Sequence, residues 1–220
     1  MNRNDRTAAD LCDQLAQVGA DAVRAGLVVG SGGNLSVRAP GGAECWVTAR
    51  GTWLDRLTLR DFVPVRIADG APLDPAAPVA STEVALHLHT YRARPDVTVV
   101  VHLHPQSVLL LDALGERIRL VTTDHAFYVG RIARVGAYPP GSTLLAERAA
   151  AAATEAECVI LAHHGCSVLA DSVELAHKRV RNLEEAAQLT YRAVLLGRGD
   201  IPECPPDVLP AQGQTATQAI

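Results

Sequence analysis

The stretch Val97-Thr98-Val99-Val100-Val101-His102-Leu103-His104-Pro105 carries the strongest structural signal in the chain. Its β-branched run predicts a buried strand over Val97–His102. Side chains two residues apart on a strand point to the same face, so His102 and His104 can both reach one ion. Taken alone, the pair fits a partly exposed strand end equally well, because imidazole is both a common ligand and a common surface group.

A second histidine pair follows another predicted strand, Cys158–Ala162, in the stretch His163-His164-Gly165. Adjacent residues on a strand face opposite ways, so only one of these two imidazoles can join the first pair. The spacing alone leaves open which one it is. Three histidines with an open fourth position are typical of a catalytic rather than a structural zinc site.

The other histidines are weaker candidates. His87 and His89 lie on a predicted helix, where residues two apart do not face each other. His177 lies in the longest predicted helix, where a solvated or packed role is expected, and His125 is unassigned.

Helical and strand patterns are intermixed along the rest of the chain. Helices are predicted over Thr7–Val29, Thr82–Arg94, Pro105–Gly115, Ser142–Thr154 and Ser172–Gly197. Further strands are predicted over Leu35–Arg38, Cys45–Thr48, Phe62–Ile67, Ile118–Thr122 and Arg131–Val135, with Gly165 as a turn. Pro64 favours an edge position for its strand. Hairpins interrupt the alternation, so an α/β layered domain around a mixed sheet is expected over residues 1–200, with residues 201–220 as a mobile tail.

The composition suits a globular protein. The 220 residues are 48% hydrophobic and 20% charged, which fits one domain with a sizeable core. A net charge of −4 without a basic cluster argues against nucleic-acid binding, and the apolar runs are too short for a membrane span. Five cysteines without a CxxC pair, and a polar stretch Met1–Asp10 that does not resemble a signal peptide, predict a cytoplasmic protein.

One carboxylate and two turns are further candidates for the site. Glu83 lies in the first predicted turn of a helix, directly after Ser81-Thr82. An acid in that place usually complements the helix dipole, and it becomes a catalytic candidate only beside a metal. The glycine-dense turn Gly30–Asn34 and the helix N-terminus at Ser81 offer backbone N–H groups to an anion, although a tight turn and a simple cap explain them equally well.

At these residues the chain resembles the class II aldolase/adducin family. It is most similar to the branch of L-fuculose-1-phosphate aldolase and L-ribulose-5-phosphate 4-epimerase. The order and spacing of five stretches agree: Gly33–Arg38, Thr48–Gly51, Ser81–Glu83, His102–Pro105 and His163–Gly165. The resemblance spans roughly Leu11 to Gly197.

The resemblance implies a fold, a metal and a set of site residues. The implied fold is a single-domain, three-layer α/β/α structure with a mixed, mostly antiparallel sheet of nine strands. The implied assembly is a homotetramer with active sites between subunits. One divalent ion per subunit is expected, zinc first and manganese or cobalt as alternatives, with His102, His104, His164 and Glu83 as ligands. Glu83 also becomes the proton donor and acceptor. The residues that match the family's phosphate-binding positions are Gly33, Asn34, Arg50, Gly51, Ser81 and Thr82.

Two departures from the family bear on the substrate. Arg50 stands where the aldolases often have a small hydroxyl residue, and its guanidinium would bind an anion in a bidentate way. Thr123 stands where fuculose-phosphate aldolase has a tyrosine that acts as an acid on a neighbouring subunit's substrate. Asp124 or Tyr128 is therefore the expected second acid.

The expected reaction is cleavage of a ketose 1-phosphate to dihydroxyacetone phosphate and an aldehyde. The substrate would resemble L-fuculose 1-phosphate or 5-deoxyribulose 1-phosphate. The alternatives are a pentulose-5-phosphate 4-epimerase, a methylthioribulose-1-phosphate dehydratase-like lyase, a sugar-acid phosphate decarboxylase and a non-catalytic adducin-like scaffold. A non-catalytic scaffold is expected to have lost the metal-binding residues of the family, whereas all three histidines and Glu83 are present in this chain.

Overall fold

A seven-stranded sheet forms the middle of the structure, a computed structural model that describes residues 7–39 and 41–209. The strand order is β3-β2-β1-β4-β7-β6-β5, and every neighbouring pair is antiparallel except the parallel pair β5–β6. The strands are β1 (Asn34–Val37), β2 (Glu44–Thr48), β3 (Phe62–Arg66), β4 (Val99–Leu103), β5 (Ile132–Val135), β6 (Cys158–Leu161) and β7 (Gly165–Ala170).

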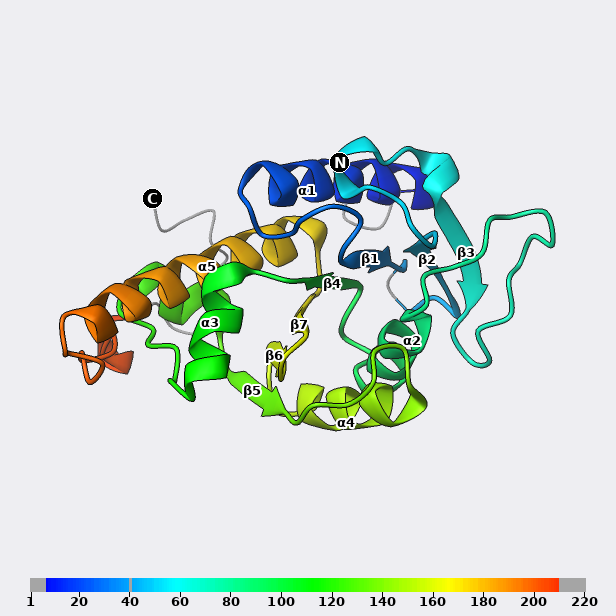
Figure 1. Ribbon diagram of the computed structural model, residues 1–220. Helices are drawn as coiled ribbons and strands as arrows, with labels where there is room; N and C mark the ends of the chain where they lie inside the picture. Colours follow the sequence, from blue (N-terminus) through cyan, green and yellow to red (C-terminus); the bar gives the residue numbers. More distant parts are fainter. Residues whose placement is uncertain (1–6, 40, 210–220) are drawn as a thin grey trace.

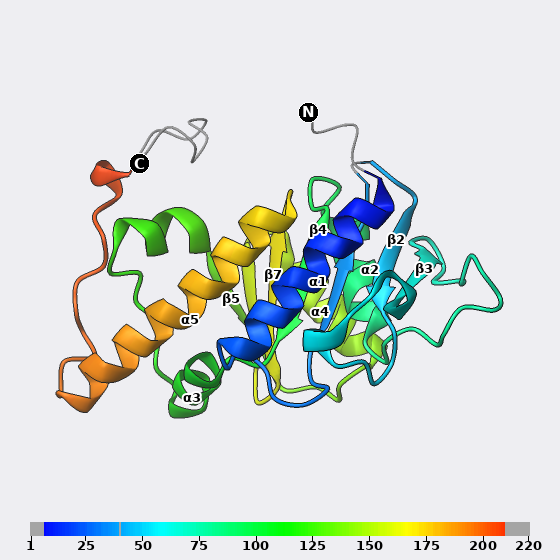
Figure 2. The same cartoon turned by 90° about the horizontal axis from the view of Figure 1, so that it is seen from above.

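Helices cover both faces of this sheet. The longer ones are α1 (Ala8–Arg24), α2 (Val84–Ala93), α3 (Gln106–Leu114), α4 (Thr143–Ala153) and α5 (Val173–Leu195). Short helical segments are η2 (Leu54–Arg56), η3 (Leu59–Asp61), the π-helical η4 (His125–Val129) and η5 (Pro206–Val208). Figure 1 shows α1 and α5 on one side of the sheet and α2 and α4 on the other, and Figure 2 shows α1 and α5 side by side on their shared face. The three-layer α/β/α prediction is confirmed.

The central strand β4 separates two hydrophobic cores. Val99, Val101 and Leu103 belong to the core beneath α1 and α5, whereas Val100 belongs to the core that α2 and α4 cover. Because side chains alternate along a strand, His102 faces the same side as Val100. A fully buried imidazole is thereby directed at α2.

The element bounds differ from the predictions at two helix ends. The first helix ends at Arg24 instead of Val29, because Gly26 adopts a left-handed conformation (φ 71°) and the N–H of Leu27 turns back to the Ala22 carbonyl. Helix α2 begins at Val84, so Glu83 occupies the N-cap position instead of the first turn. Its predicted end before Pro95 is confirmed.

Two predictions about strands are wrong. Ile118–Thr122 forms no strand, because the N–H of Arg119 bonds to the Thr190 hydroxyl of α5 and the Leu120 carbonyl accepts from the N–H of Cys204. Gly165 is no turn residue but the first residue of β7, a strand the sequence reading missed. The resemblance implied nine strands, and the described residues form seven. The edge position of β3 is confirmed.

The predicted C-terminal tail is described as far as Leu209. Within it, Glu203 lies 2.8 Å from the Arg117 guanidinium, and η5 follows. The remainder, residues 210–220, lies outside the described residues. In the part of the chain that the structure describes, no helix has the length and apolarity needed to cross a bilayer.

A buried arginine ties α5 to the neighbouring chain segments. The Arg179 side chain donates from Nε to the Tyr128 carbonyl at 2.6 Å and from its terminal nitrogen to the Leu169 carbonyl. Only 8% of Arg179 is exposed. The arginine therefore holds η4 on the α5 side of the sheet.

We expect Arg179→Met to lower the free energy of unfolding by roughly 2–4 kcal/mol, because it removes a charged donor from two carbonyls in the interior. Arg192→Met, the same change at an exposed site on α5, should cost less than about 1 kcal/mol. Urea unfolding followed by circular dichroism measures both. Equal effects of the two substitutions would show that these hydrogen bonds do not stabilise the fold.

Candidate metal centre

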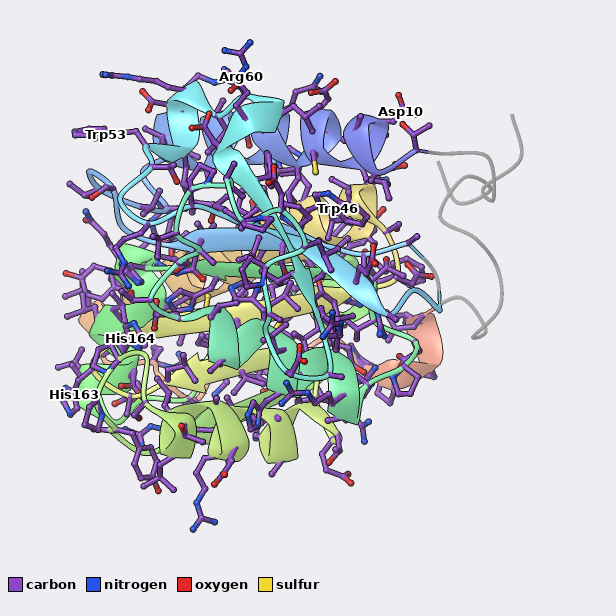
Figure 3. All side chains as sticks on the ribbon, turned by 90° about the vertical axis from the view of Figure 1, so that its right-hand side faces the viewer. Asp10, Trp46, Trp53, Arg60, His163 and His164 are labelled. Atoms are coloured by element: carbon purple, nitrogen blue, oxygen red, sulfur yellow. The ribbon has the colours of Figure 1, made fainter. Side chains whose placement is uncertain are left out.

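Three imidazoles converge at one end of the sheet. His102 lies in β4, His104 follows that strand, and His164 belongs to the turn between β6 and β7. One ligand atom from each lies within 4.8 Å of the others, and the two Nε2 atoms of His102 and His104 are 3.2 Å apart. Figure 3 shows His163 and His164 at the end of the molecule opposite Asp10.

Strand pairing explains why these residues meet. Strands β4 and β7 are antiparallel, with His102 opposite Ser167 and Leu103 opposite Cys166, so the end of β4 lies beside the start of β7. The turn before β7 is tight, and His163 adopts a positive φ of 58°. The histidine spacing left open which residue of this turn joins the pair, and the family resemblance implied His164. The structure brings in His164, whereas the His163 side chain is exposed.

The glycine after His164 is required by close packing. A Cβ on Gly165 would lie 2.5 Å from the Leu103 carbonyl oxygen and 2.6 Å from the His104 ring. Real side chains do not approach so closely, so only glycine lets the two strand ends come together here.

Two neighbouring groups fix the orientation of the first pair. The Nδ1–H of His102 donates to the Cys166 carbonyl oxygen at 3.1 Å, which turns Nε2 toward the other imidazoles. Glu184 of α5 accepts from the N–H groups of Ser107 and Val108, which fixes the start of α3 just after His104. In the turn between β6 and β7, the Asp112 carboxylate accepts a hydrogen bond from the His163 N–H and so fixes the backbone of that turn.

Glu83 completes the cluster from α2. One carboxylate oxygen lies 3.2 Å from His102 Nε2, and the other lies 3.2 Å from His164 Nε2. Burial alone would raise the pKa of the Glu83 carboxyl, but its hydrogen bonds and the neighbouring imidazoles outweigh burial and lower the pKa to about 2. The group is therefore a carboxylate at neutral pH.

The donor set fits a divalent cation. Two of its buried atoms, Glu83 Oε1 and His164 Nδ1, have no hydrogen-bond partner among the described residues. Tetrahedral ligands about 2.0–2.1 Å from one ion are about 3.3 Å apart, close to the 3.2 Å separations seen here. Burial and the neighbouring imidazoles lower the pKa of His104 to about 4, so its lone pair is free at neutral pH. Imidazole and carboxylate together suit zinc, manganese or cobalt.

The residues predicted to bind phosphate lie beside this cluster. The N–H of Glu83 donates to the Ser81 hydroxyl at 3.2 Å, the N–H of Ser81 donates to the Thr48 carbonyl, and Ala49 bridges to Ala80. This ladder brings the segment with Arg50 and Gly51 next to the segment with Ser81 and Thr82. Gly33 and Gly51 both have a positive φ, and the side chains of Arg50 and Thr82 are exposed.

Asn34 has a different environment from the one its predicted role suggests. It pairs with His102 across β1 and β4 and is only 5% exposed. Its amide donates to Glu83 Oε2 at 3.0 Å, and its Oδ1 lies 2.5 Å from His87 Nε2. Sequence reasoning set His87 aside by comparing it with His89. The missed signal was the spacing of four among Glu83, His87 and Tyr91, which places all three on one face of α2.

The two expected acids are not brought to the histidines within one chain. The Tyr128 carbonyl bonds to Arg179, and its ring lies 5.5 Å from the Lys178 ammonium, so it packs on the α5 side of the sheet. Glu83 and His102 lie on the α2 side. Asp124 is exposed just before η4. The catalytic role of Tyr128 and Asp124 stays a prediction.

The cysteines take no part in the cluster. Cys158 and Cys166 are fully buried, and burial raises the pKa of both thiols, that of Cys158 to about 12. They act as small hydrophobic residues.

The chain is similar to known proteins over most of its length. The model of the "Class II Aldolase and Adducin N-terminal domain" matches residues 13–191. An L-fuculose phosphate aldolase of Methanococcus maripaludis is 34% identical over 168 residues, which are 74% of this chain and 87% of that protein. A 3-oxo-tetronate 4-phosphate decarboxylase of Escherichia coli K12 is 31% identical over 186 residues, 82% of this chain and 86% of that one.

A solved structure is similar as well. The crystal structure of L-fuculose-1-phosphate aldolase from Thermus thermophilus superimposes with a TM-score of 0.74 at 26% identity, covering 88% of this chain and 98% of that one. The fold, the family match and the relatives lead to one conclusion: this chain belongs to the class II aldolase/adducin family.

Proposed function

We propose that this protein is a divalent-metal-dependent lyase that cleaves a ketose 1-phosphate by a retro-aldol reaction to dihydroxyacetone phosphate and an aldehyde. The observation that carries the proposal is the convergence of three imidazoles with a buried carboxylate in a member of this family. L-Fuculose 1-phosphate and 5-deoxyribulose 1-phosphate are the substrates to test first. A non-catalytic scaffold would have no use for a buried carboxylate held beside three imidazoles.

His102, His104 and His164 would hold the cation, with Glu83 as a fourth ligand before substrate binds. A bound divalent cation supplies Lewis-acid stabilisation of the negative charge that develops on the substrate when its carbon–carbon bond breaks. In cleavage, Glu83 would take up the proton that the substrate hydroxyl releases and pass it to the carbon that becomes nucleophilic; in bond formation, the Glu83 carboxylate would remove the proton from that carbon. Its ionised state and its contacts with two imidazoles support that assignment.

The phosphate would bind where two turns meet beside the cluster. Ser81 and Thr82 precede α2, and their segment lies next to the turn of Arg50 and Gly51. The exposed Arg50 guanidinium can form two parallel hydrogen bonds to phosphate oxygens. The N–H of Gly33 would complete this phosphate site from the other side, whereas the Asn34 amide is occupied by Glu83 and His87.

Decarboxylation of a sugar-acid phosphate is the second candidate. The decarboxylase relative matches a larger share of this chain than the aldolase relative does, 82% against 74%. Thr123 also stands at the position of the expected aldolase tyrosine. Loss of carbon dioxide leaves the same kind of electron pair on carbon, so the same metal and Glu83 would serve either reaction.

The family resemblance also implies a homotetramer, and the second acid would then come from a neighbouring subunit. Buried free thiols at Cys12, Cys45, Cys158 and Cys166 suit a reducing cytoplasm. Light scattering of the purified protein measures the assembly directly.

A product screen decides between the reactions. Ketose 1-phosphates, pentulose 5-phosphates and 3-oxo sugar-acid phosphates are each incubated with the protein and zinc, manganese or cobalt. We expect release of dihydroxyacetone phosphate, detected by a coupled reductase. Carbon dioxide would identify the decarboxylase, and an isomeric sugar would identify the epimerase.

Glu83→Gln should lower kcat by at least about 100-fold, because the amide cannot exchange the proton. The substitution keeps the shape of the side chain and leaves three imidazoles for the ion. Kinetics and metal content are measured on the same preparation. Turnover within a few-fold of the parent, with metal still bound, would show that Glu83 is not the proton carrier.

The two adjacent histidines provide a matched pair of variants. His164→Ala should reduce the bound metal well below one ion per chain, because it removes one imidazole from the cluster. His163→Asn should keep full occupancy, since this side chain is exposed and asparagine tolerates a positive φ. Mass spectrometry of the dialysed proteins gives the metal content. Equal occupancy in both variants would contradict the assignment of His164.

A further inference from the structure

A line of buried polar side chains runs from Glu83 into the interior between α2 and β1. Asn34 Nδ2 lies 3.0 Å from Glu83 Oε2, and Asn34 Oδ1 lies 2.5 Å from His87 Nε2. Ser36 Oγ continues the line, 2.6 Å from His87 Nδ1 and 2.7 Å from the Tyr91 hydroxyl. His87 and Ser36 have no exposed surface, and Tyr91 has 1%.

The direction of every hydrogen bond in this line follows from the carboxylate. Asn34 donates from its NH₂ group to Glu83 Oε2, so its Oδ1 is turned toward His87. An amide oxygen only accepts, so His87 must carry a proton on Nε2.

The inner half of the line is determined by the same reasoning. Complete burial lowers the pKa of His87 to about 3, so the ring is neutral and Nδ1 has no proton. Nδ1 therefore accepts from the Ser36 hydroxyl, and Ser36 in turn accepts from Tyr91. The Thr98 carbonyl lies 3.3 Å from the Tyr91 hydroxyl, as a second, longer acceptor. Every donor along the line points toward Glu83.

We propose that His87 is a positioning residue: its Nε2–H fixes the orientation of the Asn34 amide, and that amide holds Glu83 Oε2. This inference rests on the proposed role of Glu83 as proton carrier. Fixing one oxygen leaves Oε1, which lacks a hydrogen-bond partner among the described residues, as the oxygen that faces His164 and the substrate.

The line also explains why polar groups occupy a core position. Each buried polar group costs free energy unless it is hydrogen-bonded, and apolar side chains of similar size would fill this space without that requirement. If His87 carried its proton on Nδ1, two lone pairs would face each other at Asn34. The amide would then rotate and present its oxygen to the Glu83 carboxylate, where the two groups repel.

Nitrogen-15 NMR of the full-length, metal-free protein tests the orientation without any activity. We expect His87 to be the neutral tautomer with its proton on Nε2. Assignment comes from the loss of those signals in His87→Gln. A proton on Nδ1, or a doubly protonated ring at neutral pH, would overturn the inference whatever reaction the protein catalyses.

Kinetics and zinc affinity of matched variants test the consequence. His87→Leu removes the donor to Asn34 and should lower kcat or zinc affinity about 10- to 100-fold, as is usual for a residue that orients a metal site's ligands, with KM changed less than kcat. His87→Gln can still donate to Asn34 and should restore most of the loss. Ser36→Ala should increase the population of the His87 tautomer with its proton on Nδ1, and kcat should fall as that population rises.

Thr90→Val is the control, because this buried hydroxyl on the same helix bonds to the Leu86 carbonyl and to no other group among the described residues. Its kcat and zinc affinity should equal those of the parent. If His87→Leu keeps kcat and zinc affinity within about twofold while Glu83→Gln loses turnover, the positioning role is wrong and the proposed function stands. If Glu83→Gln is itself fully active, the proposed function fails and the positioning role fails with it.

Discussion

The antiparallel pairing of β4 with β7 is the constraint on which the site depends. It places the end of one strand beside the start of the other, so His102 and His104 meet the turn that carries His164. Gly165 permits this approach because any side chain there would collide with the Leu103 carbonyl and the His104 ring. The histidine cluster is thus a consequence of sheet register, supported by the bond from His102 to the Cys166 carbonyl.

The second element of the site comes from α2, which packs on the face of the sheet toward which His102 points. Glu83 stands at the N-cap of this helix with its carboxylate between two imidazoles. A buried carboxylate is unfavourable unless it is paired, and here imidazoles and the Asn34 amide supply the partners. The line of polar side chains continues inward along α2 through His87. One face of this helix therefore carries residues that contact the site.

Local patterns predicted most of the fold and the placing of His102 and His104 on one face of a strand end. The β-branched run before His102 and the caps at Ser142 and Ser172 identify their elements correctly, because these signals lie within a few residues of one another. Ile118–Thr122 was predicted wrongly because its backbone partners are Thr190 and Cys204, which are distant in sequence. The choice of His164 over His163 depends on turn geometry, and the role of His87 depends on contacts with β1. Neither is visible in the spacing of histidines.

Anomalous diffraction from crystals of the wild-type protein, recorded at the absorption edge of zinc, manganese or cobalt, tests the metal centre most directly. We expect one peak per chain, with nitrogen atoms of His102, His104 and His164 about 2.0–2.2 Å from the ion. An ion bound elsewhere, or no ion after incubation with all three metals, would contradict this centre. That result would leave the fold assignment intact, but it would rule out the proposed metal-dependent reaction at this site.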